Sequence, residues 1–158
     1  MVGRPRSSKR TRRTESEASS FASTPGVRGR MQVQRTRDTA PEMALRRALH
    51  SMGLRYRVDR APLPGLRRRA DIVFGPAKVA VFVDGCFWHG CPEHGTAARV
   101  NADYWSAKIE RNRVRDADTD ARLFADGWTV VRVWEHTPPA EAAVLVAKAV
   151  AETRTGPA

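Results

Sequence analysis

The chain has 158 residues, which is enough for one domain with its own core and for extensions beside it. Its 28 Lys and Arg residues exceed its 17 Asp and Glu residues, so the formal charge is +11 and a polyanionic partner is favoured. No stretch approaches the length of a membrane-spanning apolar segment, and the basic N-terminus lacks the apolar core of a secretory signal. We therefore predict a cytoplasmic protein without membrane association.

Most of the excess positive charge lies near the N-terminus. Residues 1–37 hold ten basic against two acidic residues, a net charge of +8, and the remainder contributes only +3. The segment 1–28 has few large apolar residues, so we expect it to be disordered. It is either a solubilising extension or an arm that releases counterions from DNA. We expect the folded domain at 29–152 and a flexible C-terminus at 153–158.

The distribution of apolar and turn-forming residues predicts an α/β fold. Thr39-Ala40-Pro41-Glu42 fits a helix-initiating capping box, and Gly53 marks the end of that helix. The further expected elements, in chain order, are strands at 54–58, 71–74 and 78–83, a helix at 103–124, a strand at 128–134 and a helix at 141–150. This order predicts a mixed central sheet flanked by helices.

Both cysteines of the chain lie in one short loop, in the pattern Cys86-x4-Cys91-x2-His94. Cysteine and histidine are ligands that zinc prefers, and this loop is short enough to surround one ion. His136, just after the strand at 128–134, is the best candidate for a fourth ligand. Four protein ligands predict a closed, structural zinc site. The alternative is a pair of small buried thiols, with His94 at the surface and His136 uninvolved.

Two acids mark the neighbouring ends of consecutive strands. Asp71 begins one apolar strand and Asp84 ends the next, so both carboxylates are expected at one edge of the sheet. A carboxylate is poorly accommodated there without a cation, and Mg²⁺ prefers oxygen ligands, to which the backbone oxygen of Val83 could be added. His89 is the natural proton-transfer residue because imidazole titrates near neutral pH. The sequence therefore predicts a hydrolytic site with a catalytic Mg²⁺.

Two further acids, Glu42 and Asp116, lie on the flanking helices and are candidates for orienting water. Three of the acids also have plain structural interpretations. Asp71 would be a cap at the start of its strand, Glu42 the acid of the capping box, and Asp116 one of many solvated charges on a long helix.

Three aromatic residues lie around the cysteine loop. Phe87 and Trp88 are adjacent in a polar, glycine-flanked segment, and Trp105 opens the following helix. Aromatic rings inserted between base pairs offset lost base stacking, so these side chains are candidates for a wedge into duplex DNA. The alternative is that Trp105 belongs to the helix core and Phe87 packs over the cysteine loop.

Six segments carry a resemblance to a known family. In order along the chain they are Arg37-Asp38-Thr39-Ala40-Pro41-Glu42, Leu63-Pro64-Gly65, Asp71-Ile72-Val73-Phe74, the run from Phe82 to His94, Lys108-Ile109-Glu110-Arg111-Asn112, and Val133-Trp134-Glu135-His136. In these segments the chain resembles the very short patch repair endonucleases (Vsr family), across roughly residues 31–137. The tail before Gly29 is outside the resemblance.

The resemblance implies a fold related to type II restriction endonucleases, the PD-(D/E)xK superfamily. It also implies a Mg²⁺-dependent nick beside the thymine of a T·G mismatch, which arises when 5-methylcytosine deaminates. By position, Asp71 corresponds to the family's metal-binding aspartate, His89 to its catalytic histidine, and Val83 to a residue whose backbone oxygen binds metal. The remaining correspondences are to supporting acids and to side chains that enter the duplex: Glu42 and Asp116, and Phe87, Trp88, Trp105 and Met31.

Four features depart from the family pattern. Asp84 replaces a histidine of the best-known member, and Ala70 precedes Asp71 where a proline is usual. The order of the zinc ligands differs, and Val83 lacks a hydroxyl, which a backbone ligand does not need. None of these departures removes a group that the chemistry requires. The resemblance further implies double-stranded DNA as the partner, mismatch-repair proteins as candidate protein partners, and a location at the bacterial nucleoid. We expect a monomer, since no heptad pattern or extended apolar face indicates an oligomer.

Two other functions stay open at the level of sequence. An endonuclease of the same fold could cut at a recognition sequence without requiring a mismatch. A zinc-stabilised DNA-binding module without catalysis would leave Asp71, Asp84 and His89 without a purpose.

Overall fold

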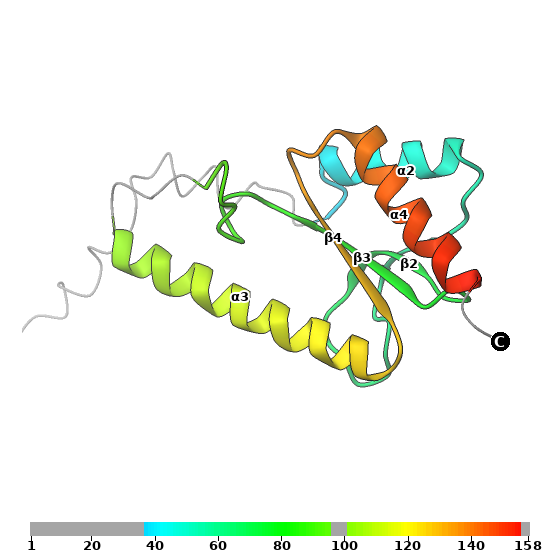
Figure 1. Cartoon of the computed structure of the whole chain (residues 1–158). Helices are drawn as coiled ribbons and strands as arrows, with labels where there is room; N and C mark the ends of the chain where they lie inside the picture. The colour runs from blue at the N-terminus through cyan, green and yellow to red at the C-terminus, as the bar shows by residue number, and fades with distance from the viewer. Residues whose placement is uncertain (1–36, 96–100, 156–158) are drawn as a thin grey trace, which may run out of the picture. The chain divides into compact units, whose positions relative to one another are not determined.

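The computed structural model describes residues 37–95 and 101–155, so Met31 and the basic segment 1–28 lie outside the described range. The elements are, in chain order, α2 (Ala40–Ser51), β1 (Arg57–Arg60), β2 (Ala70–Phe74), β3 (Val79–Asp84), α3 (Ala102–Ala125), β4 (Thr129–Trp134) and α4 (Pro139–Arg154) (Figure 1). This is the order of helices and strands that the sequence predicts. None of the described helices is both long enough and apolar enough to cross a membrane.

The four strands form one mixed sheet in the order β1-β2-β3-β4. β2 pairs antiparallel with both β1 and β3, whereas β3 and β4 are parallel. A parallel pair needs a crossover connection, and α3 supplies it. Because β2 and β3 run in opposite directions, the beginning of β2, with Asp71, lies at the same end of the sheet as Asp84, the last residue of β3. The predicted meeting of these two acids at one edge is therefore confirmed at the level of topology.

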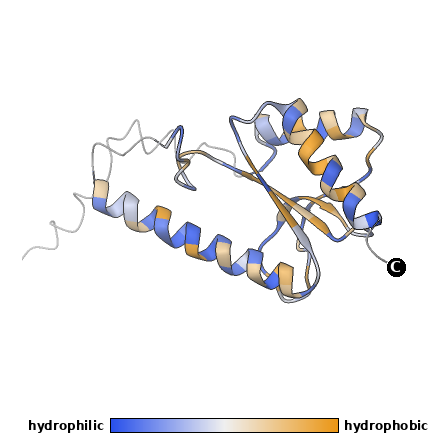
Figure 2. Cartoon of the chain, in the orientation of Figure 1, coloured by the Kyte–Doolittle hydropathy of each residue, from blue (hydrophilic) through white to orange (hydrophobic). Residues whose placement is uncertain are grey.

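Helices cover both faces of the sheet: α2 and α4 lie together on one face, and α3 lies on the other (Figure 1). The larger core, on the α2 and α4 side, consists of Leu45, Leu49, Ile72, Phe74, Val79, Val81, Val133, Ala142, Ala143, Val146 and Val150. The smaller core, under α3, consists of Leu66, Ala70, Val73, Ala80, Phe82, Leu123 and Trp128. Figure 2 shows apolar residues along the strands and a mostly hydrophilic α3. The central strands are thus apolar on both faces, as their uninterrupted apolar runs predict.

Two helices end just before the glycines that predict their ends. Gly53 and Gly127 have φ angles of 80° and 76°, directly after the C-caps of α2 and α3, where glycine carries no steric penalty. α4 is longer than the predicted 141–150, because Pro139 is accepted in its first turn and the helix continues to Arg154. The helix therefore includes the first residues of the expected C-terminal extension, and residues 156–158 lie outside the described range.

The expected capping box at the start of α2 is wrong. Thr39 is the N-cap, but its side chain makes no cap hydrogen bond. Instead its hydroxyl donates to Glu42 Oε1 at 2.9 Å, and the other oxygen of Glu42 accepts from the backbone N–H of Asp38 at 2.9 Å. The buried carboxylate of Glu42 draws these donors to itself, so it organises the turn that precedes the helix.

The first predicted strand is displaced. The sequence places it at 54–58, whereas β1 runs from Arg57 to Arg60. Leu54 and Tyr56 pack against the larger core before the strand begins, and the Tyr56 hydroxyl donates to the carbonyl of Arg46 at 2.7 Å. Leu54 and Tyr56 are therefore apolar because they pack against the core and α2, not because they pair in the sheet.

Candidate functional site

The loop 85–95, which follows β3, is held against α3. Asn112 Nδ2 donates to the carbonyl of Trp88 at 2.9 Å, and the Arg113 guanidinium donates to the carbonyl of Gly90 at 2.8 Å. Gly90 has a φ of 63°, and a Cβ atom there would lie 2.9 Å from the Arg113 guanidinium and 3.0 Å from Ile109. Glycine is required at this position both by the backbone conformation and by the approach of the helix. The loop is thus fixed in place by α3.

The four predicted zinc ligands lie together. The ligand atoms of Cys86, Cys91, His94 and His136 are all within 4.8 Å of one another. Cys86 Sγ and Cys91 Sγ lie 3.0 and 3.9 Å from His136 Nδ1, and the two thiols are free rather than joined in a disulfide. A Cys2His2 donor set at such separations fits a tetrahedral zinc ion. The structure therefore brings together all four residues, including the distant His136.

The surroundings of this cluster also fit a metal. The backbone N–H of Cys86 donates to Glu135 Oε1 at 2.7 Å, and the N–H of His94 donates to Cys91 Sγ at 3.4 Å. Burial, with help from the Cys91 thiol and the Glu135 carboxylate, raises the pKa of the Cys86 thiol to about 11. A bound zinc ion would supply the positive charge that a pair of buried thiolates needs.

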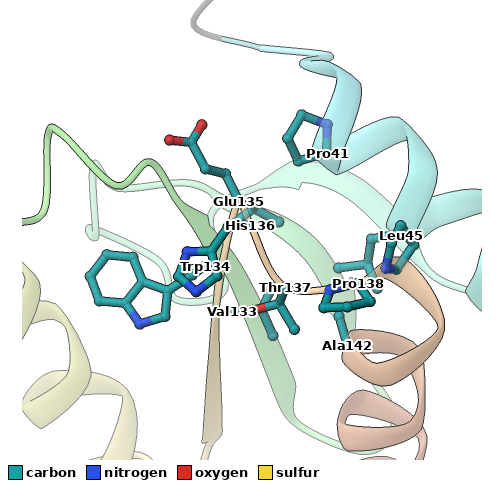
Figure 3. A pocket seen from close by; sticks show the side chains of 11 residues that line it. Pro41, Leu45, Val133, Trp134, Glu135, His136, Thr137, Pro138 and Ala142 are labelled. Atoms are coloured by element: carbon teal, nitrogen blue, oxygen red, sulfur yellow. The ribbon is translucent and has the colours of Figure 1, made fainter. Parts of the chain in front are cut away.

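A small cavity of about 140 Å³ lies behind His136, between the end of β4 and the starts of α2 and α4 (Figure 3). Figure 3 shows Trp134 and His136 on one side of it, Leu45 and Ala142 on the other, and the Glu135 carboxylate pointing away. Pockets that enclose organic ligands are usually about 300–1,000 Å³, so this space is too small for such a substrate. The candidate reaction centre lies outside this cavity, at the end of the sheet where Asp71 and Asp84 meet.

At that end of the sheet, Asp84, His89 and Asp116 form a second cluster, with their ligand atoms within 4.8 Å of one another. His89 Nδ1 lies 2.6 Å from Asp116 Oδ2 and 3.8 Å from Asp84 Oδ1. A carboxylate can only accept, so Nδ1 carries the proton and Nε2 of a neutral ring is free to take another. Asp116 was expected to orient water; its contact is with the histidine itself.

Asp71 does not belong to either cluster. Its Oδ2 accepts a hydrogen bond of 2.7 Å from the backbone N–H of Val83, just beyond the last β2–β3 pair, Ile72 with Val81. Burial raises the pKa of Asp71 to about 6; the Val83 amide opposes this shift, and the negative charges of Glu42 and Asp84 add to it. A carboxylate disfavoured by burial and by two neighbouring acids is suited to a divalent cation.

Glu42 is more strongly engaged than predicted. Besides the two contacts before α2, its Oε2 lies 3.3 Å from Arg46 Nη2, and its side chain is buried. Its charge nevertheless acts on Asp71. Glu42 thus contributes negative charge beside Asp71, and both its oxygens are already occupied.

The raised pKa of Asp71 has a consequence for stability. Without added Mg²⁺ we expect the Asp71→Asn variant to be more stable than the wild type at pH 7, by about 1–3 kcal/mol, and equally stable near pH 3. The pKa of Asp71 is about 6 in the folded state, and its ordinary value, taken for the unfolded state, is 3.8. Between pH 3.8 and pH 6 the folded protein therefore binds this proton more tightly than the unfolded protein does. The contribution of Asp71 therefore falls as the pH rises through this window. Urea unfolding from pH 3 to pH 8 measures it.

Asp118 provides the control for this experiment. Hydrogen bonds from Arg68 and Arg122 lower the pKa of this exposed carboxyl, so Asp118→Asn should give no gain at neutral pH. If Asp71→Asn also gave no gain between pH 3 and pH 8, Asp71 would not be a destabilised carboxylate. Added Mg²⁺ should stabilise the wild type at pH 7 and leave Asp71→Asn unchanged.

The three predicted aromatic residues form a single cluster. The ring centres of Phe87, Trp88 and Trp105 lie 5.2 to 5.8 Å apart in edge-to-face arrangements. Lys108 Nζ lies 4.9 Å from the Trp88 ring and 5.3 Å from the Trp105 ring. Trp105 is buried, which agrees with the alternative that it belongs to the helix core. Phe87 and Trp88 are partly exposed. Tyr104, which is 50% exposed, extends the cluster, since its ring centre lies 5.2 Å from that of Trp105.

Sequence reasoning missed Arg132. This residue interrupts the apolar strand β4, and its guanidinium donates to both oxygens of Asp84 and to Asp120. A charged residue inside an apolar strand needs a partner, so its position in Thr129–Trp134 was the available signal. The identity of the partners, 48 and 12 residues away, was not visible in the sequence.

The site gathers two acids and a histidine at one end of the sheet, an arrangement suited to hydrolysis. The relatives of this chain are described as nicking enzymes and as a DNA mismatch endonuclease. A family model described as "DNA mismatch endonuclease Vsr" matches residues 24–94, beginning slightly before the Gly29 limit of the resemblance. The type II nicking enzyme V.NaeI of Lentzea aerocolonigenes is 44% identical over 146 residues, 89% of this chain and 88% of the relative.

Two further relatives agree. The type II nicking enzyme V.XorIIP of Xanthomonas oryzae is 48% identical over 107 residues, 66% of this chain and 76% of that protein. The DNA mismatch endonuclease Vsr of Escherichia coli is 40% identical over 108 residues, 66% of each chain. This chain therefore belongs to the Vsr family of DNA endonucleases, and its substrate is DNA.

Proposed function

We propose that this protein nicks one strand of duplex DNA at a T·G mismatch left by deaminated 5-methylcytosine, and so begins very short patch repair. One observation carries the proposal: the single loop 85–95 joins the cluster of Asp84, His89 and Asp116 to the aromatic cluster of Phe87, Trp88 and Trp105. A group that unstacks a base pair and a group that cleaves beside it are thereby held together. The description of the family model supports the mismatch as the substrate.

His89 is the proposed general base. With its Nδ1–H donated to Asp116, the ring presents Nε2 to a water molecule, whose proton it takes as the oxygen attacks the phosphate. The P–O bond to one sugar oxygen breaks as the new bond forms, and the leaving oxygen takes a proton from solvent. Asp116 stabilises the imidazolium that results. Asp84, fixed by Arg132, lies 3.8 Å from the same ring and adds a second negative charge beside it.

Asp71, through its carboxylate, and Val83, through its backbone oxygen, are the residues that would hold a magnesium ion. When bound, the ion supplies charge stabilisation at the phosphate and lowers the pKa of a coordinated water. The proposal is supported by the raised pKa of Asp71 and by the adjacent charges of Glu42 and Asp84. The positions of Asp71 at the start of β2 and of Asp84 at the end of β3 also support a relation to the PD-(D/E)xK fold of restriction endonucleases.

The zinc ligands have a structural role in this proposal. Cys86, Cys91, His94 and His136 would hold a zinc ion that fixes the loop carrying His89 and the aromatic residues. Phe87 and Trp88 would enter the duplex beside the mismatch, where a T·G wobble pair costs less to unstack than a matched pair. Trp105 would support them from α3. The proposed minor-groove contact, Met31, lies outside the described residues.

The magnesium part of this function is tested with a labelled duplex that carries one T·G pair. We expect nicking when Mg²⁺ is added to protein with its zinc retained, none without Mg²⁺, and none with Asp71→Ala. The matched control is Glu152→Ala, an exposed acid of α4 whose ion pair is with Lys148, which should nick like the wild type. Nicking of the T·G duplex by Asp71→Ala at the wild-type rate would overturn the metal assignment.

A further inference from the structure

Arg132 contacts both carboxylates that face His89. Its guanidinium donates to the two oxygens of Asp84, at 2.9 and 3.1 Å, and to Asp120 at 2.8 and 2.9 Å. It also lies 3.8 Å from Asp116 Oδ1 and 4.6 Å from the centre of the Phe82 ring. The guanidinium is thus clamped between the end of β3 and the middle of α3.

Two carboxylate oxygens lie near His89 Nδ1, and only one of them is at hydrogen-bond distance. Asp116 Oδ2 lies at 2.6 Å and Asp84 Oδ1 at 3.8 Å. Asp84 Oδ1 is the same atom that accepts from Arg132 Nη1 at 2.9 Å. The hydrogen bond from arginine therefore engages the acceptor that would otherwise compete with Asp116.

Asp84 needs such a partner. The residue is 7% exposed, and an unpaired carboxylate at that burial is costly. In the described part of the chain, the other cationic side chain recorded within 4.0 Å of the Asp84 carboxylate is His89, whose Nδ1 lies at 3.8 Å. Rotation of Asp84 toward Nδ1 would draw the ring away from Asp116 and turn Nε2 from its present direction.

We propose that Arg132 is a positioning residue of the nuclease site: by holding Asp84, it directs the Nδ1–H of His89 to Asp116 and so fixes the direction of Nε2. This inference rests on the proposed function, in which His89 Nε2 takes the proton of the attacking water. A purely structural role would need only the ion pair between Arg132 and Asp120, which ties β4 to α3. The proposed role needs the contact between Arg132 and Asp84. A structural role alters stability, whereas a positioning role acts on the rate of the chemical step and depends on Asp84.

The test compares Arg132→Met, Arg132→Lys and the control Arg68→Met. Arg68 also ties its segment to α3, by bonds of 2.9 Å to Asp118 and 2.7 Å to Thr119, but has no contact with Asp84. For Arg132→Met we expect kcat for nicking to fall about 10- to 100-fold, with KM within about threefold of wild type. Arg132→Lys should recover part of kcat, since an ammonium can pair with Asp84 but lacks the two-pronged geometry. Arg68→Met should keep the wild-type kcat.

The dependence on Asp84 is measured by combining variants. Adding Arg132→Met to Asp84→Asn should lower kcat no further than about twofold, because a neutral amide no longer needs the guanidinium. In addition, NMR of 15N-labelled histidine, in protein that retains its zinc and has no added Mg²⁺, should show a changed His89 Nδ1 signal in Arg132→Met and an unchanged one in Arg68→Met. The NMR comparison does not require nicking.

Several results would overturn the proposal. The first is that the losses of kcat caused by Arg132→Met and Asp84→Asn multiply when the two substitutions are combined. The second is that Arg132→Met changes KM and leaves kcat unchanged. The third is that folded Arg132→Met has an unchanged His89 Nδ1 signal. If Arg132→Met fails to fold, Arg132→Lys carries the same comparison. If the wild-type protein nicks no duplex, the proposed function is wrong, and the NMR comparison alone decides whether Arg132 directs His89.

Discussion

Replacing His89 by alanine is expected to lower the rate of DNA nicking by about 10²- to 10⁴-fold while DNA binding is retained. The reason is that Nε2 of His89 has no substitute: Asp116 binds the opposite nitrogen, and both oxygens of Asp84 accept from Arg132. Single-turnover nicking of a labelled T·G duplex, with binding measured separately on the same duplex, gives both quantities.

The orientation of the ring can be tested apart from its presence. Asp116→Asn should also lower nicking, by about 10²-fold or more, because the amide can donate to Nδ1 and move the ring proton to Nε2. The control is Asp118→Asn, two residues further along α3, where the carboxylate pairs with Arg68 and Arg122 and not with the site. Equal activity of Asp116→Asn and the wild type would show that the Asp116 contact has no part in the reaction.

Removal of zinc is expected to have the second large effect. We expect the purified protein to contain one zinc ion, and Cys86→Ser and His94→Asn to lack it. Because the loop of these ligands also carries His89, loss of the metal should abolish nicking. It should also lower the melting temperature by on the order of 10 °C, which corresponds to a loss of a few kcal/mol in the free energy of unfolding. Metal analysis and thermal unfolding of the same samples measure both effects.

The matched control for zinc is His50→Asn. His50 and His94 are both exposed histidines, and burial alone predicts little effect from either substitution. Only a metal role for His94 makes the two variants differ. If His94→Asn retained its zinc and its melting temperature, as His50→Asn should, then His94 would not be a ligand.

The order of the elements could be predicted from the sequence because each has a local signal. Gly53 and Gly127 end their helices, and the continuous apolar runs of β2 and β3 indicate strands that are covered on both faces. β1 could not be placed, since Arg57–Arg60 is a polar edge strand held by hydrogen bonds to β2 rather than by burial. The apolar residues that suggested a strand, Leu54 and Tyr56, pack against the core instead.

The candidate site was predictable where its chemistry is local. Cys86, Cys91 and His94 share one loop. His136 directly follows a strand whose end was expected to lie beside that loop. The partners of Asp84 and His89 were not predictable, because Arg132 and Asp116 are 48 and 27 residues away. Such contacts depend on how α3 and β4 lie beside β3, and the register of that packing is not written in any local pattern.

The proposed substrate is a mismatched base pair rather than a recognition sequence alone, so nicking of matched and mismatched duplexes is compared. The protein is mixed with Mg²⁺ and duplexes that differ only in one base pair, T·G, T·A or C·G, across a set of flanking sequences. We expect a nick beside the thymine of the T·G duplex and at least about 100-fold slower nicking of both matched duplexes. Equal nicking of matched and mismatched duplexes would contradict the claim and would favour a sequence-specific endonuclease that needs no mismatch.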